Sequence, residues 1–107
     1  MEIFTIRKLI REQAAGERPY LEFLRRESMS LGLYVLPAGG IDPQQPHNED
    51  EVYYVISGQG QVTVGNETRP VQPGSIIFVS AQAPHKFHHI TETLQLLVFF
   101  APPESNT

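Results

Sequence analysis

The stretch QPHNEDEVYYVISG, residues 45–58, decides the fold of this chain together with PGSIIFVSAQAPHKFHH, residues 73–89. The two stretches hold all four histidines of the sequence, which are His47, His85, His88 and His89. Each stretch includes a run rich in β-branched and aromatic residues, which is typical of a strand. Because a sheet brings strands together from distant parts of a chain, the pattern predicts one site that is built from both stretches.

The composition is that of a small all-β domain. Of the 107 residues, nine are proline and eight are glycine, and hydrophobic residues make up 40% against 19% charged. This balance argues against disorder and favours many tight turns. A turn is expected at residues 58–60, since Gly-Gln-Gly separates two strand-like runs. The expected strands are 28–36, 51–56, 61–64, 68–71, 75–79, 86–90 and 94–100.

Short strands with frequent turns between them, and no helix after residue 28, predict an antiparallel sandwich or barrel. We expect this single β domain at residues 29–101, preceded by a strand and a short helix at 1–28 and followed by a loose polar tail at 102–107. The helix is predicted at 18–27, where apolar residues recur at helical spacing after Pro19.

Charge, cysteine content and hydropathy limit the partners and the compartment of the protein. The net charge is −4, and the basic residues near the N-terminus alternate with glutamates, so no nucleic-acid surface is expected. The absence of cysteine excludes disulfides and thiolate metal sites. No apolar run is long enough to span a bilayer and no signal peptide is expected, which predicts a cytoplasmic protein without membrane contact. The edge strands of a sheet need covering, and Ile3, Phe4 and Ile6 can supply a docked or exchanged strand.

Even spacing places the candidate ligands on one side of each strand-like run. Gln45, His47 and Glu51 are separated by even numbers of residues, as are His85 and His89, and such side chains of an extended chain point the same way. If both runs face the interior of one barrel, an imidazole from each and a carboxylate converge on one point. Two imidazoles and one carboxylate are the ligand set of non-haem Fe(II) sites, and they also suit Mn, Ni or Zn.

These residues resemble the two motifs of the cupin superfamily, G-x5-H-x-H-x3,4-E-x6-G and G-x5-P-x-G-x2-H-x3-N. His47, Glu51 and Gly58 take the second histidine, the glutamate and the closing glycine of the first motif. Gly74 and His85 take the first glycine and the histidine of the second motif. The resemblance covers most of the chain outside the N-terminal segment, and it implies the single small β-barrel of the cupins, a double-stranded β-helix or jelly roll. Because small cupins commonly pair, the resemblance also implies a homodimer.

Four positions depart from these motifs. Gln45 stands where the first histidine is expected, Ser80 and Gln82 replace the proline and glycine of the second motif, and His89 replaces its asparagine. The resemblance implies a divalent metal ion, Fe, Mn, Ni or Zn, held by Gln45, His47, Glu51 and His85. Gln45 is a weaker, neutral ligand, and it is open whether it binds the metal, supports a ligand, or marks a site that has lost its metal.

The other polar and aromatic side chains of the two stretches have simpler interpretations. His88 faces away from the site by alternation and is expected at the surface, whereas His89 shares the side of the site. Glu49 and Asp50 are expected in a solvated loop, with the alternative that one of them replaces Glu51 as ligand. The remaining candidates are aromatic residues of the core or pocket wall (Tyr53, Phe78 and Phe87) and solvent-facing bases that can orient an anion (Arg69 and Lys86).

Charge counting suggests the class of ligand. A divalent ion with Glu51 as its one anionic protein ligand leaves the site at about +1, which favours a further anionic ligand. We therefore expect a metal-dependent enzyme of the oxygenase, isomerase or lyase type that acts on a small anionic or enolisable molecule. The alternatives are a cupin that binds a metal or small molecule without turnover, as a sensor or sugar-binding module, and a barrel with an empty pocket that serves assembly. The fold does not decide among them, and no catalytic residue is assigned beyond the ligands.

Overall fold

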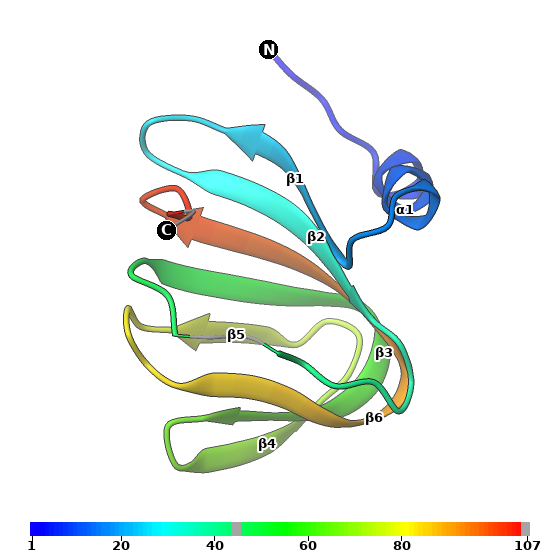
Figure 1. The fold of residues 1–107 in the computed structure, drawn as a ribbon, viewed down its shortest axis with the longest axis vertical. Coiled ribbons are helices and arrows are strands. Elements are labelled where there is room, and N and C mark those ends of the chain that lie inside the picture. The colour runs from blue at the N-terminus through cyan, green and yellow to red at the C-terminus, as the bar shows by residue number, and fades with distance from the viewer. Residues whose placement is uncertain (44–45, 106–107) are drawn as a thin grey trace.

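The computed structural model describes residues 1–43 and 46–105, so Gln45 lies outside the described residues. One helix and six strands make up the described part (Figure 1). No helix among the described residues is long and apolar enough to cross a membrane. In chain order the elements are α1 (Ile6–Ala15), β1 (Tyr20–Arg25), β2 (Ser30–Leu36), β3 (Asp50–Val64), β4 (Glu67–Val71), β5 (Ile76–Val79) and β6 (His85–Ala101).

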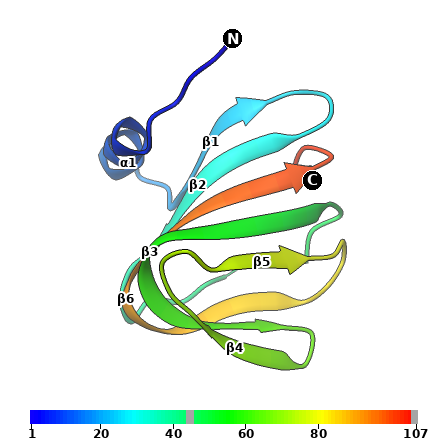
Figure 2. The same cartoon turned by 180° about the vertical axis from the view of Figure 1, so that it is seen from behind.

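The strands form an antiparallel sheet in the order β1-β2-β6-β3-β4, with β5 also paired to β3. Strands β3 and β6 pair along almost their whole length, from Asp50 opposite Ala101 to Val64 opposite His85. Figure 1 shows that this long ribbon bends sharply, and Figure 2 shows the same bend from behind. Buried residues of both halves, such as Tyr53 and Phe87, belong to one hydrophobic core. The all-β jelly roll with a short N-terminal helix is therefore confirmed, although among the described residues the sheet does not close, because β1 and β4 remain at its two ends.

The turn predicted at residues 58–60 is wrong, because β3 passes through this segment without interruption. The pairing of β3 with β6 shifts register three times between Val55 and Gln61, which marks a bulged bend rather than a hairpin. Gly58 lies at the centre of the bend with φ of 99°, and a side chain there would collide with the backbone carbonyl of Thr93. The strands predicted at 86–90 and 94–100 likewise form one bent strand, β6.

The helix predicted at 18–27 is also wrong, since this segment contains β1, which pairs with β2. The register shifts between Glu22 and Leu24, so Phe23 is the extra residue of a bulge. A bulge interrupts the alternation of a strand, and here it spaces the apolar residues as a helix would. The ladder of hydrogen bonds to β2 outweighs the local pattern.

The short N-terminal helix of the protein is α1, which packs on β1 and β2 outside the core. Leu9 is its buried residue. Residues 1–5 form no strand in this chain, and Ile6 begins the helix, so the predicted docked strand is not formed here. Phe4 instead contacts Phe23 of the same chain, with ring centroids 5.0 Å apart.

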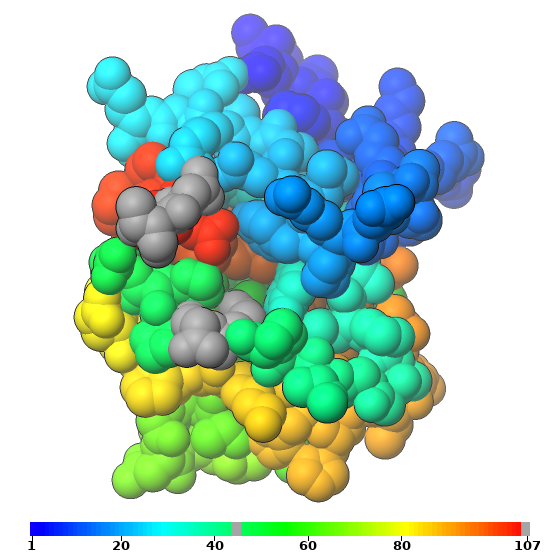
Figure 3. Space-filling view, in the orientation of Figure 1, coloured from blue at the N-terminus to red at the C-terminus, as the bar shows by residue number. Residues whose placement is uncertain are grey.

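The chain beyond β6 returns to the mouth of the jelly roll. The Glu104 N–H donates to Ser30 Oγ at 2.9 Å, and the Arg25 guanidinium donates to the Glu104 carbonyl at 2.7 Å. Figure 3 shows this C-terminal segment, in red, between the loop that joins β1 to β2 and the residues before β3. Residues 102–105 of the predicted loose tail are thus hydrogen-bonded to the barrel, and they place the Glu104 side chain beside the candidate site.

Candidate metal centre

Glu51 and His85 come from opposite ends of the β3–β6 ribbon. Glu51 pairs with Phe100 and His85 with Val64, so the two side chains meet because the ribbon bends back on itself. His85 Nε2 lies 2.8 Å from Glu51 Oε1, and both side chains are 1% exposed. The bend of the ribbon is therefore what assembles this part of the site.

The loop between β2 and β3 carries His47 to the same place. The backbone of this loop is tied to the barrel, since the Gly39 N–H donates to the Ile90 carbonyl at 2.9 Å and the Gln82 N–H to the His47 carbonyl at 2.6 Å. The buried Asp42 carboxylate adds a third tie by accepting a hydrogen bond from the Phe87 N–H at 2.9 Å. These ties hold the His47 ring 5.5 Å, centroid to centroid, from the ring of His85.

Three of the four predicted ligands therefore come together. One donor atom from each of His47, Glu51 and His85 lies within 4.8 Å of the other two. An ion that binds donors at about 2.1 Å needs them no more than about 4.2 Å apart, so a small contraction of the site suffices. The fourth predicted ligand, Gln45, is outside the described residues.

The environment of the donors fits a divalent metal ion. Glu51 Oε2 is buried and has no hydrogen-bond partner among the described residues, and a bare carboxylate oxygen at this depth is costly unless a cation balances it. His85 Nδ1 lies 3.0 Å from the Ala83 carbonyl, and His47 Nδ1 lies 3.4 Å from Glu104 Oε2. Acceptors at Nδ1 orient both rings with Nε2 as the metal-binding atom, as is usual for histidine ligands.

The protonation of His85 depends on its carboxylate partner. Burial alone would lower its pKa, but the hydrogen bond to Glu51 and the Ala83 carbonyl outweigh burial, so the pKa of His85 is raised above its ordinary value. Tyr53 OH, 3.2 Å from His85 Nε2, faces the same nitrogen. Without a metal, His85 therefore keeps its proton beside Glu51 to a higher pH than an ordinary histidine does, because its pKa is raised.

We expect this proton to make the stability of the metal-free protein depend on pH. A pKa that is raised on folding contributes stability below the unfolded pKa of about 6.5, and this contribution is lost as the pH rises through the folded pKa. The charged groups that face His85 are Glu51 and Asp42, with His47 alongside. Thermal unfolding of chelator-treated protein and of His85→Gln between about pH 6 and 8.5 measures the effect. The difference in melting temperature between the wild type and His85→Gln should shrink as the pH rises. A difference that stays constant over this range would contradict the raised pKa of His85.

Several other predicted residues lie elsewhere. Glu49 is buried at 4% exposure rather than solvated, because its carboxylate accepts a hydrogen bond from the Ser105 N–H at 3.2 Å. Alternation predicts that His89 lies on the same side of the strand as His85. The φ of 49° at His89 breaks the alternation, so its side chain is exposed. Its Nδ1 is hydrogen-bonded to Nδ1 of His88 at 2.6 Å. Phe78, predicted in the core or pocket wall, is 60% exposed and lines a groove between β4 and β5 instead of the core. The expected positions of Tyr53 and Phe87 (core) and of Arg69 and Lys86 (solvent) are confirmed.

Two residues beside the metal centre are missed by sequence reasoning. The sequence pattern places Glu104 in a loose tail and Tyr20 in the apolar stripe of a helix. Burial, followed by the carboxylates of Glu49, Glu51 and Glu22, raises the pKa of Glu104. Burial, reinforced by Glu104 and other carboxylates, also raises the pKa of Tyr20, whose hydroxyl has no hydrogen-bond partner among the described residues. No sequence signal points to Glu104. Had the bulge in β1 been recognised, Tyr20 would have been predicted to face the interior.

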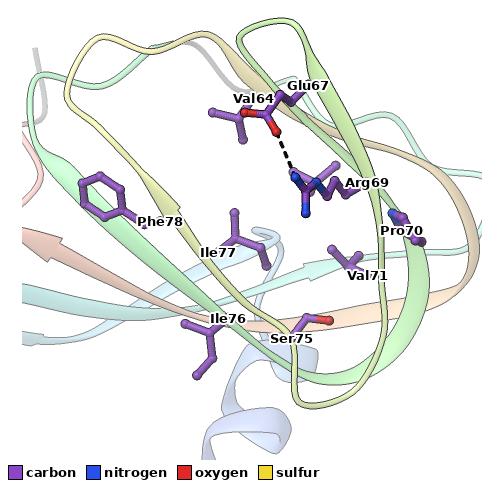
Figure 4. A pocket seen from close by; sticks show the side chains of 10 residues that line it. Val64, Glu67, Arg69, Pro70, Val71, Ser75, Ile76, Ile77 and Phe78 are labelled. Atoms are coloured by element: carbon purple, nitrogen blue, oxygen red, sulfur yellow. Dashed lines mark hydrogen bonds and ion pairs between the residues drawn. The ribbon is translucent and has the colours of Figure 1, made fainter.

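A second hollow lies between β4 and β5, and none of the three donors lines it. It is a groove of about 440 Å³ whose floor includes Val64, Val71 and Ile77 (Figure 4). Its charged residues are Glu67 and Arg69, which pair with each other at 3.2 Å and are both exposed. The groove contains no histidine and no carboxylate pair among the described residues, so it offers no site for metal chemistry.

Comparisons with known proteins agree with this geometry. The chain is 52% identical over 105 residues to the uncharacterized protein SCO3923 of Streptomyces coelicolor, in a match that covers 98% of this chain and 100% of that protein. The crystal structure of TT1209 from Thermus thermophilus superposes with a TM-score of 0.73 and 30% identity over 96% of this chain and 99% of that one. The DMSP lyase DddQ from Ruegeria pomeroyi shares the fold with a TM-score of 0.66 and 23% identity over 71% of this chain, which spans 39% of that protein.

The family assignment follows from the sequence as well as from the fold. The signature described as "Cupin domain" matches residues 32–100, which contain β2 to β6 almost completely and all three of the clustered donors. Of the motif residues, Glu51 and His85 meet in the structure at 2.8 Å and Gly58 has a positive φ. The chain therefore belongs to the cupin family.

Proposed function

We propose that this cupin binds a divalent metal ion through His47, Glu51 and His85 and acts on a small molecule that reaches the ion through an anionic or enolisable group. The observation that carries the proposal is the buried carboxylate of Glu51, which lies 2.8 Å from one imidazole and within 4.8 Å of the donor of another. Bound there, the ion would supply Lewis-acid polarisation of a chelated oxygen. The reaction class that we favour is that of an oxygenase, isomerase or lyase.

The side chains around the donors support a chemical role. Tyr53 OH lies 3.2 Å from His85 Nε2 and is fully buried, so it can orient an oxygen at this point or hold a proton there. Phe100 covers the other side of the site, with its ring centroid 5.0 Å from that of His47. An apolar cover excludes water and strengthens electrostatic interactions inside the site.

Binding without turnover is the second candidate. His85 and Glu51 contact each other directly, so the two donors can pair when no metal is bound. A metal-responsive sensor would require such a stable metal-free state. The name of DddQ indicates that a protein of this fold can be a lyase, but the likeness is one of fold alone. The predicted homodimer stays a prediction.

Metal loading followed by substrate screening separates the candidates. The protein is prepared without added metal, its metal content is measured, and it is then loaded with Fe(II), Mn(II), Ni(II) or Zn(II). Small carboxylates and diketones should perturb the spectrum of Co(II) placed in the site, and oxygen consumption or product formation with diketones and 2-oxo acids would identify an enzyme. Perturbation without turnover across the panel would favour the binding role, and no perturbation at all would contradict the proposal of a chelating ligand.

A further inference from the structure

A small cavity adjoins the metal centre and shares His47 with it. Its volume is about 180 Å³, which is below the roughly 300–1,000 Å³ of pockets for whole drug-sized ligands and suits one small chemical group. It lies between the elements β1, β2 and β6 and the C-terminal segment. Its lining residues are Tyr20, Tyr34, His47, Val98, Phe100 and Glu104.

Aromatic rings form much of the wall of this cavity. The ring of Tyr20 lies 6.1 Å from that of Tyr34 and 6.5 Å from that of Phe100, both edge to face. Gly32 makes this arrangement possible, because a side chain at that position would collide with the ring of Tyr20. Three aromatic rings line this small volume, and the face of an aromatic ring attracts a cation.

The charged group in the wall of the cavity is negative, which also attracts a cation. Glu104 is the one carboxyl residue of the lining, and no lysine or arginine of the described residues lines the cavity. The guanidinium of the nearby Arg25 already has hydrogen-bond partners. Its Nη1 donates to Glu22 Oε1 and its Nη2 to the Glu104 carbonyl, both at 2.7 Å. The cavity is therefore a poor site for an anion.

Polar atoms around the cavity remain unsatisfied. The hydroxyl of Tyr20 and Oε1 of Glu49 are buried without hydrogen-bond partners among the described residues, and Glu49 is only 4% exposed. Glu49 and Glu104 add two carboxyl groups beside that of Glu51, which a metal ion offsets. A cationic group in the cavity would lie next to these two carboxyl groups, while the anionic end of the same molecule meets the metal.

We propose that this cavity binds the alkylammonium group of a small zwitterionic molecule whose anionic end reaches the metal. The proposal rests on the proposed function, since it names the class of ligand for the same site. The anionic group meets the positive metal with its one carboxylate ligand, while the cationic group lies against the rings of Tyr20, Tyr34 and Phe100 with Glu104 as counter-ion. The cavity then acts as a selectivity filter for charge.

Glycine betaine and 3,3-dimethylbutanoate test this selectivity, because they have the same shape and differ in having nitrogen or carbon at the branched centre. Calorimetric titration of the metal-loaded protein should show glycine betaine binding about tenfold more tightly than 3,3-dimethylbutanoate, which lacks the cationic end. Glu104→Gln and Tyr20→Leu should each remove most of this preference. Glu92→Gln, which removes an exposed carboxylate on the distant bend, should retain it.

Tetramethylammonium separates the cavity from the metal centre. It should bind to both metal-loaded and chelator-treated protein, more weakly in Glu104→Gln and Tyr20→Leu than in wild type. Equal affinity for glycine betaine and 3,3-dimethylbutanoate in the wild-type protein would overturn the proposal. Tetramethylammonium binding that neither variant weakens would also overturn it. If either result came with normal metal content, the proposed function would still hold. If the protein bound tetramethylammonium but took up no metal, the cavity assignment would hold and the proposed function would fail.

Discussion

Replacement of His85 by alanine is expected to lower the affinity for the metal ion by at least about 100-fold, so that dialysed protein retains almost none. Loss of groups that merely support ligands already costs about 10–100-fold, and His85 is itself one of three donors within 4.8 Å of one another. Elemental analysis of the purified variant after dialysis measures the loss. Circular dichroism verifies that the β fold remains.

His88→Ala is the matched control, because it removes the same side chain from the same strand. His88 hydrogen-bonds to Thr63 Oγ1 at 2.7 Å and does not belong to the cluster of donors. Its metal content should equal that of the wild type, while His47→Ala should lose metal as His85→Ala does. Full metal retention in His85→Ala, or equal loss in His85→Ala and His88→Ala, would show that the ion binds elsewhere.

Replacement of Gly58 by alanine is expected to destabilise the protein by about 2–5 kcal/mol. Its φ of 99° is unfavourable for a residue with a side chain, at about 1–2 kcal/mol. The added methyl group also meets the backbone at Thr93 and Leu94, and forced backbone shifts cost about 1–3 kcal/mol. Urea unfolding of metal-free protein measures the change in the free energy of unfolding.

Gly65→Ala separates the two contributions of Gly58. Gly65 also has a positive φ, 61°, but a side chain there has no neighbour within 4 Å. It should therefore cost only the conformational part, about 1–2 kcal/mol. Equal destabilisation by the two variants would mean that β6 does not constrain Gly58. Because the bend at Gly58 brings Glu51 to His85, Gly58→Ala should also weaken metal binding, whereas Gly65→Ala should not.

The clustering of His47, Glu51 and His85 could be predicted because the spacing of Glu51 and His85 is tied to strand geometry. Glu51 and His85 begin the inward-facing positions of two strands, and Tyr53 and Phe87 continue them as fully buried residues. The departures at positions 82 and 89 also acquire a physical meaning. Gln82 and His89 both have positive φ, at 67° and 49°, where the cupin pattern has glycine and asparagine, the residues that adopt this conformation most readily.

Two errors in the fold share a cause, the β-bulge. A bulge adds one residue to a strand and disturbs the alternation from which strands are recognised. Phe23 makes β1 look helical, and Gly58 makes the middle of β3 look like a turn. In both places pairing with another strand determines the structure and overrides the local pattern.

The cavity beside the metal centre was beyond sequence reasoning for a related reason. Glu104 reaches it through backbone hydrogen bonds to Ser30 and Arg25, which depend on the shape of the tail rather than on its composition. Tyr20 reaches it because Gly32 on the neighbouring strand leaves room for its ring. Such contacts join residues that are distant in the chain, and neither side of the contact has a distinctive pattern.

The most direct test of the metal centre is a crystal structure of the Zn(II)-loaded protein with anomalous diffraction data from the zinc edge. We predict one anomalous peak at about 2.0–2.2 Å from a nitrogen of His47, an oxygen of Glu51 and Nε2 of His85. A protein that carries stoichiometric zinc but shows its peak away from these three side chains would contradict the account.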